Sequence, residues 1–185
     1  MVSEKVLRKY AELAVKMGAN VQKGQMLVIS SDVRNHEFVN MCVEEGYKAG
    51  AGKVAVDWSS EHDTKWSYEY MSKEDLSEIP QWTYDKREYA QKKGCCFLNI
   101  SSATPGLLKD IDSEKVLARQ MAASKKFLPL QGYTMGNEGQ WCIVALPSEG
   151  WAKKVFPDME VNEAVKALWD AILMSVRVSE DNDPV

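Results

Sequence analysis

Residues 10–58 contain YAELAVK (10–16), NVQKGQ (20–25), MLVI (26–29) and AGKVAVDW (51–58), and the order of these segments indicates the fold class. The first segment has apolar residues at helical spacing, and the polar turn after it leads into a short apolar run typical of a buried strand. A second helical pattern then ends near Gly50, where a second apolar strand follows. Helix, buried strand, helix and buried strand in this order are typical of an α/β protein.

The same alternation continues to the end of the chain. The predicted elements are helices within 61–94 that Pro80 interrupts, a strand at 95–100, a long helix after Asp112 or Ser113, a strand at 141–146 and a last helix over 161–176. Apolar strands that alternate with amphipathic helices predict a mainly parallel sheet flanked by helices on both faces. We expect one α/β domain over residues 1–178, and polar residues 179–185 to begin a linker.

Composition excludes several functional classes. The formal net charge is -4, with 23 basic residues scattered among 27 acidic ones, so a nucleic-acid-binding face is not expected. No run approaches the roughly 18 apolar residues that span a bilayer, and the start of the chain lacks the apolar core of a signal peptide. The cysteines at 42, 95, 96 and 142 lie in apolar patterns, as reduced thiols do, which predicts a cytoplasmic protein without disulfides.

Three near-matches to catalytic motifs fail at a decisive residue. The helix that starts at His36 has Asn40 where a zinc-protease helix needs its second histidine. GAGK at 50–53 is followed by Val54, where a phosphate loop needs serine or threonine. Ser148 lies in an incomplete nucleophile elbow, and no histidine follows residue 62. The sequence therefore predicts no catalytic residue and no metal ligand.

Two features leave alternatives open. The many tryptophans and tyrosines of residues 58–89 fit a partner-facing or substrate-facing surface, and they equally fit helices packed on the sheet. The apolar stripe of the last helix, which includes Trp169 and Leu173, can be satisfied within the domain or against a further part of the protein.

The quoted segments, together with FLNISS (97–102), WCIVALP (141–147), LWDAI (168–172) and DPV (183–185), resemble one protein family. The order and spacing of these segments are similar to those in the amino-terminal half of the metal-dependent aminopeptidases related to aminopeptidase T, aminopeptidase S and PepS. The resemblance extends over nearly the whole chain, although no single motif is a chemical fingerprint.

The resemblance implies that the parent protein is an exopeptidase that removes amino-terminal residues from peptides. Two divalent metal ions of the zinc or cobalt type would be held by Glu, His, Tyr and Asp side chains in the other half, and would activate a water molecule between them. No position here corresponds to those ligands, so we expect no metal bound by this chain and no activity of the chain alone. The resemblance also implies a homodimer.

Residues at the carboxyl ends of the predicted parallel strands are the candidates for a substrate-cavity wall, because ligands of open α/β sheets bind at that edge. These residues are Ser30, Ser31, Asp32, Trp58, Ser59, Ser101, Ser102, Pro147 and Trp151.

Two rival hypotheses remain at this point. A stand-alone, non-catalytic α/β binding or dimerisation module would form a stable dimer without any metal. An independent hydrolase or transferase would show turnover by these 185 residues alone, although no credible pair of nucleophile and base is present.

Overall fold

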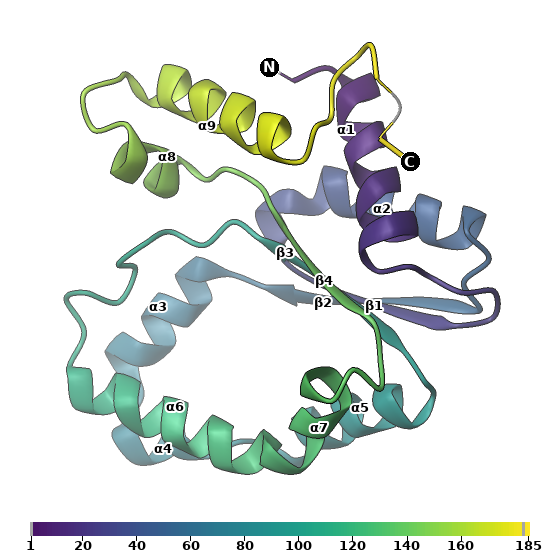
Figure 1. Cartoon of the computed structure of the whole chain (residues 1–185). Coiled ribbons are helices and arrows are strands. Elements are labelled where there is room, and N and C mark those ends of the chain that lie inside the picture. Colours follow the sequence, from purple (N-terminus) through teal and green to yellow (C-terminus); the bar gives the residue numbers. More distant parts are fainter. Residues whose placement is uncertain (1, 183) are drawn as a thin grey trace.

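Four parallel strands form the centre of the molecule. The computed structural model describes residues 2–182 and 184–185, so Met1 in the predicted domain and Asp183 in the predicted linker lie outside the described residues. The sheet has the strand order β2-β1-β3-β4 (Figure 1). Its strands are β1 (Met26–Asp32), β2 (Lys53–Ser59), β3 (Cys96–Ser101) and β4 (Trp141–Ala145). All pairs of neighbouring strands are parallel, which confirms the predicted fold class.

Helices at both ends of the sequence cover one face of the sheet (Figure 1). They are α1 (Glu4–Glu12), which continues as the π-helical turn η1 (Leu13–Gly18), with α2 (His36–Lys48), α8 (Glu149–Val155) and α9 (Val161–Ser175). Ser3 caps α1, because its hydroxyl accepts a hydrogen bond from the Val6 amide. Ala164, Leu168 and Ile172 of α9 are buried in this layer, so the stripe of the last helix is largely satisfied within the domain.

The middle of the chain lies on the opposite face (Figure 1). It forms α3 (Glu61–Tyr70), α4 (Lys73–Ser77), α5 (Gln81–Lys92), α6 (Ser113–Phe127), the short 3-10 turn η3 (Leu128–Leu130) and α7 (Gln131–Met135). A second 3-10 turn, η2 (Val33–Asn35), joins β1 to α2. Asp112, not Ser113, caps α6. Trp66, Trp82 and Tyr70 are exposed, so much of the aromatic surface in this layer faces outward.

The hydrophobic core is asymmetric about the sheet. Leu27 and Ile29 of β1 and Leu98 and Ile100 of β3 point toward α1 and α2 and belong to the main core. On the other face only a small cluster forms, around Val28, Ala90 and Cys95, while Asn99 and Ile143 stay exposed. Helices therefore flank both faces, but dense packing is confined to one of them.

The first helix ends at Gly18, the last residue of η1, but this glycine does not adopt the positive φ that is usual after a helix. The chain passes through η1 and leaves the helical conformation at Asn20, whose φ is 48°. A Cβ atom on Gly18 would lie 2.6 Å from Cys142 Sγ, so the glycine permits β4 to pack closely against η1. This glycine is a packing residue, and only the approach of a distant strand shows why it is needed.

The segment after α9 folds back onto α1. Lys9 Nζ donates to the carbonyl oxygens of Ser179 (2.9 Å) and Glu180 (2.7 Å) and also contacts Asn182 O, and Ser3 Oγ donates to Glu180 Oε1 at 2.7 Å. Residues 179–182, expected to begin a linker, are therefore anchored to the first helix.

Candidate functional site

Polar residues at or just after the carboxyl ends of the four strands form two hydrogen-bonded groups at that end of the sheet. One group contains Asp32, Arg34, Glu61, Thr104 and Ser148, and the other contains Ser31, Asn35 and Ser102; we call the two together the strand-end network. Because parallel strands end at the same edge, residues far apart in the sequence meet there.

Asp32 is the central acceptor of the strand-end network. Its Oδ1 accepts from the backbone amide (3.0 Å) and from Nε (2.7 Å) of Arg34, and its Oδ2 accepts from the Glu61 amide at 3.0 Å. Burial by itself would raise the pKa of Asp32, but the hydrogen bonds and the charge of Arg34, with the Glu61 amide, outweigh it and lower the pKa. Asp32 therefore joins the end of β1 to the start of α3 as an ionised carboxylate.

Glu61 connects α3 to the loop after β3. Its carboxylate accepts from the Thr104 amide, its Oε2 accepts from Thr104 Oγ1 at 2.9 Å, and the same oxygen lies 2.9 Å from Arg34 Nη2. Arg34 thus bridges Asp32 and Glu61, so one guanidinium forms ion pairs with both carboxylates.

Amide and hydroxyl groups complete the strand-end network. Asn35 Nδ2 donates to Ser31 Oγ (3.0 Å) and to Ser102 Oγ (2.8 Å), which joins β1 to β3. Thr104 Oγ1 lies 3.5 Å from Ser148 Oγ, and Ser148 also caps α8. These hydrogen bonds stabilise the carboxyl end of the sheet by joining the segments that follow different strands.

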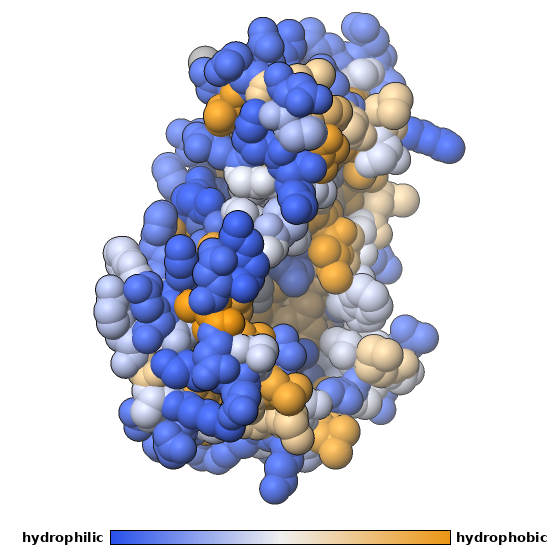
Figure 2. All heavy atoms as spheres, turned by 90° about the vertical axis from the view of Figure 1, so that its left-hand side faces the viewer, coloured by the Kyte–Doolittle hydropathy of each residue, from blue (hydrophilic) through white to orange (hydrophobic). Residues whose placement is uncertain are grey.

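The structure brings the predicted wall residues to one side of the molecule but gives them different environments. Figure 2 looks onto this side and shows a recess between the part that contains α8 and α9 and the part that contains α3 and α6. Ser31, Asp32 and Ser102 are buried, and Trp58 (47% exposed) and Ser59 are exposed. The half-buried members are Ser30, Ser101, Pro147 and Trp151.

Sequence reasoning missed Arg34, Asn35, Glu61, Thr104 and Ser148. Ser148 had a local signal, because it precedes a helix and serine is a preferred N-cap residue. Arg34 and Asn35 had a weaker signal, because they closely follow a strand-end aspartate. Glu61 and Thr104 had none, because they bond to each other across 43 positions of the sequence.

The histidines and cysteines are the other side chains of the domain that could carry chemistry. In residues 2–182 and 184–185, no group of three or more His, Cys, Asp or Glu side chains could hold a metal ion. Burial raises the pKa of Cys95 to about 11 and that of Cys96 to about 12, so both thiols stay protonated at neutral pH. His62 packs on Trp66, with 5.8 Å between ring centroids.

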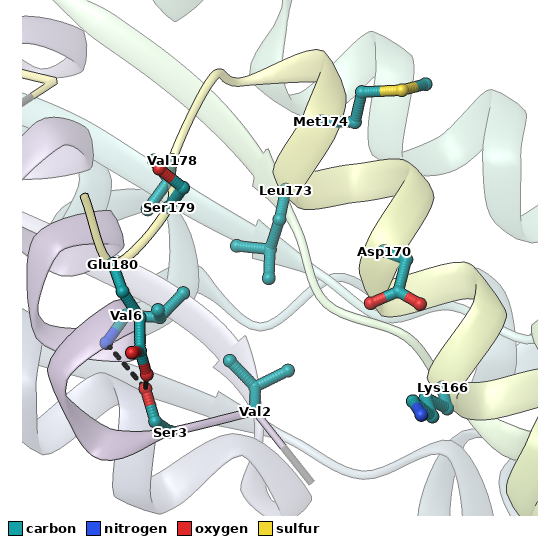
Figure 3. Close-up of a pocket in the computed structure, with 10 residues that line it drawn as sticks. All are labelled: Val2, Ser3, Val6, Lys166, Asp170, Leu173, Met174, Val178, Ser179 and Glu180. Carbon is teal, nitrogen blue, oxygen red and sulfur yellow. Dashed lines mark hydrogen bonds between the residues drawn. The ribbon is translucent and has the colours of Figure 1, made fainter. Parts of the chain in front are cut away.

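A second concave region lies far from the strand-end network. A cavity of about 330 Å³ opens between the start of α1, the face of α9 and the segment after α9 (Figure 3). Val2, Val6 and Leu173 supply its apolar surface, and Lys166 and Asp170 lie at its rim on successive turns of α9. This cavity is where the folded-back segment meets the domain, and it contains no cluster of reactive groups.

The geometry defines an α/β domain whose buried polar strand-end residues bond to one another. Comparison with known proteins gives the family: the model of the thermophilic metalloprotease (M29) family matches residues 3–185. The chain is 39% identical to aminopeptidase AmpS of Bacillus subtilis over 176 residues, which are 95% of this chain and 43% of that protein. It is 30% identical to aminopeptidase T of Thermus thermophilus, over 97% of this chain and 44% of that protein. The chain therefore belongs to the M29 metalloprotease family.

A solved structure agrees with this assignment. The wild-type AmpT structure from Thermus thermophilus superposes with a TM-score of 0.87 at 29% identity, covering 94% of this chain and 44% of that one. The chain thus spans less than half the length of the relatives that it matches. In the part of the chain that the structure describes, no helix is long and apolar enough to cross a membrane.

Proposed function

We propose that this chain is the amino-terminal, non-catalytic domain of a metal-dependent aminopeptidase that releases amino-terminal residues from peptides. The observation that carries the proposal is the match of almost the whole chain to only 43–44% of proteins named aminopeptidases. The strand-end network supports it, because its carboxylates are occupied in holding the sheet edge together.

The family description implies a metal, and the residues present do not fit one. His36 and His62 are the two histidines of the chain, and they join no potential metal-binding group within the described residues. We therefore derive no catalytic step here, and we propose that two divalent ions of the zinc or cobalt type belong to a catalytic half outside this chain.

Activity measurements on two proteins test the proposal. We expect the 185-residue chain to hydrolyse leucine p-nitroanilide no faster than buffer, with or without Zn²⁺ or Co²⁺. A protein extended past residue 185 to the length of its relatives should hydrolyse the same substrate and lose activity on treatment with a chelator. Metal-dependent turnover by the short chain would refute the non-catalytic assignment, and an inactive, correctly folded long protein would refute the peptidase assignment.

We propose that Trp58 is the principal substrate-facing residue of the cavity wall. It is the most exposed large side chain among the predicted wall residues, whereas Asp32, Ser31 and Ser102 are buried in the strand-end network. In the extended enzyme, Trp58→Ala should raise KM for a peptide by roughly tenfold, the equivalent of about 1.4 kcal/mol of lost contact, and leave kcat unchanged.

Trp82→Ala is the matched control for this prediction, because Trp82 is also exposed but lies on α5. Equal KM values for Trp58→Ala and the unmodified enzyme would remove Trp58 from the substrate wall.

We further propose that the parent enzyme is a cytoplasmic homodimer that binds neither nucleic acid nor membrane. The net charge of -4 supports the absence of nucleic-acid binding. The cysteines are all free thiols, and Cys42, Cys95 and Cys96 are buried as small hydrophobic residues, which supports a reducing compartment.

A further inference from the structure

The chain leaves the last helix through a sharp and well-defined turn. Arg177 follows α9 in the left-handed conformation, with a φ of 57°, which non-glycine residues rarely adopt. The Arg177 amide donates to Met174 O at 3.2 Å. The Val178 amide donates to Leu173 O at 3.0 Å. These two hydrogen bonds form a Schellman motif, so the chain turns away from the helix axis directly after α9.

Val178 anchors this turn in the hydrophobic core. It is 5% exposed and belongs to the main core of the domain. Val178 and Leu173 both line the cavity between α1 and α9, and an apolar contact between these two positions is usual in a Schellman motif (Figure 3). A buried side chain at this point prevents the following residues from leaving the domain as a flexible tail.

Residues 179–182 then form a hydrogen-bonded turn of their own. Asn182 Oδ1 accepts from the Ser179 amide at 2.8 Å and from Ser179 Oγ at 3.0 Å. Asn182 Nδ2 donates to Arg177 O, so one side chain closes the turn at both ends. We call this turn, with the two residues at the start of the chain that bind it, the exit clasp; it consists of Ser3, Lys9 and residues 179–182.

Lys9 bonds to three carbonyl groups of the exit clasp. Its Nζ donates to Ser179 O at 2.9 Å and to Glu180 O at 2.7 Å, and it also bonds to Asn182 O. An ammonium group has three N–H donors and no acceptor, so these carbonyls use its full donor capacity. Lys9 therefore holds the turn together from the side of α1.

The exit clasp is attached to α1 at two separate points. Ser3 Oγ donates to Glu180 Oε1 at 2.7 Å (Figure 3), and Lys9 lies about 9 Å further along the helix axis. The helix itself is fixed in the domain by the buried side chains of Val6 and Tyr10. Two attachments at different positions on a fixed helix determine the direction of the bound segment as well as its location.

We propose that Lys9 is a positioning residue for the peptidase reaction of the parent enzyme. Through the exit clasp it fixes the direction in which the chain continues toward the catalytic half. This inference rests on the proposed function, because it requires a catalytic half beyond residue 185. A polar segment without such contacts behaves as a flexible linker, which would let the two halves move relative to each other.

A fixed exit also fixes the orientation of the substrate-cavity wall. The exit clasp and the strands that end at the wall belong to one domain with a shared core, to which Val178, Ile29 and Leu98 contribute. A peptide that contacts both halves then binds to a preformed arrangement, and it does not have to order the halves when it binds. Leucine p-nitroanilide has no further residues to reach the wall, so we expect its turnover not to depend on the exit clasp.

Lys9→Met tests the exit clasp in the 185-residue chain, because methionine keeps an apolar stem and removes the three donors. The order parameter of the Ser179 amide, measured by magnetic relaxation, should fall from about 0.85 to below about 0.6. Lys5→Met is the matched control, since Lys5 is exposed on the same helix and should leave this value unchanged. Circular dichroism confirms that each variant is folded.

Asn182→Ala provides a second route to the same result. This variant opens the turn from the other side and leaves α1 unaltered, so it replaces Lys9→Met if that variant does not fold. We expect the same loss of order at the Ser179 amide.

Kinetics of the extended enzyme test the positioning role. Lys9→Met and Asn182→Ala should each raise KM for a tetrapeptide that begins with leucine by roughly fivefold, because the wall is no longer preoriented. The kcat and KM for leucine p-nitroanilide should stay unchanged in the same variants. Lys5→Met should leave the kinetics of both substrates unchanged.

The possible results separate this inference from the proposed function. An unchanged order parameter at Ser179 in the folded variants would overturn the exit clasp, whatever the activity. An active extended enzyme whose variants keep the original KM for the tetrapeptide would refute the positioning role and leave the proposed function standing. An extended enzyme without any peptidase activity would refute the proposed function and the positioning role together.

Discussion

Leu98→Ala is expected to lower the free energy of unfolding by about 3 kcal/mol, because it removes a fully buried side chain from the middle of the sheet and leaves a cavity. Leu98 is 1% exposed and lies on β3, where it pairs in register with Ile29 of β1 and Cys142 of β4. Strands on both sides limit how far the surrounding structure can relax into the space. Urea denaturation followed by circular dichroism measures the loss.

Leu117→Ala provides the control for this prediction. Leu117 is 57% exposed on α6, so the same truncation there should change the free energy of unfolding by less than about 0.5 kcal/mol. Equal stability of the two variants would contradict the assignment of the main core to the α1 and α2 side of the sheet.

Asp32→Ala is expected to destabilise the domain by about 2 kcal/mol, because it leaves the amides of Arg34 and Glu61 without their acceptor. Arg34 is partly exposed, so water can compensate for part of the lost ion pair, and the cost stays below that of a fully buried pair. Asp32→Asn keeps an acceptor oxygen, so it should lower the free energy of unfolding by less than Asp32→Ala does. Glu4→Ala, which breaks the exposed pair with Arg8, should cost almost nothing.

The contribution of Asp32 should depend on pH. Its pKa is lowered in the folded state, so the unfolded chain takes up the proton first as the pH falls. The stabilisation by Asp32 is therefore complete above the pKa of this residue in the unfolded chain, about 3.9. It is lost as the pH falls through the lower pKa of Asp32 in the folded state. The difference in unfolding free energy between the unmodified chain and Asp32→Asn should be constant near neutral pH and shrink below about pH 4. A difference that stays constant into acid would exclude Asp32 as an ionised centre of the network.

The strands and most helix boundaries follow from local patterns. Short apolar runs between turn residues predicted all four strands, and the serine or aspartate before α1 and α6 supplied the cap that such residues prefer. The strand-end position of the wall residues also follows from the sequence, since parallel strands present their carboxyl ends together. These features depend on neighbours within a few residues, and a linear pattern contains that information.

Only the tertiary structure shows what those residues do. Asp32, one of the predicted wall residues, is bonded to Arg34 and Glu61, whereas Trp58 is exposed at the same end of the sheet. Gly18 ends the first helix, and the structure adds that β4 packs against it. Tyr10 bonds to both backbone groups of Ala145, which lies 135 residues away. The sequence by itself determined the fold class and the family resemblance, because periodicity and motif order are properties of the linear chain. The partners of each polar group were decided by contacts between distant segments, which form only when the chain folds.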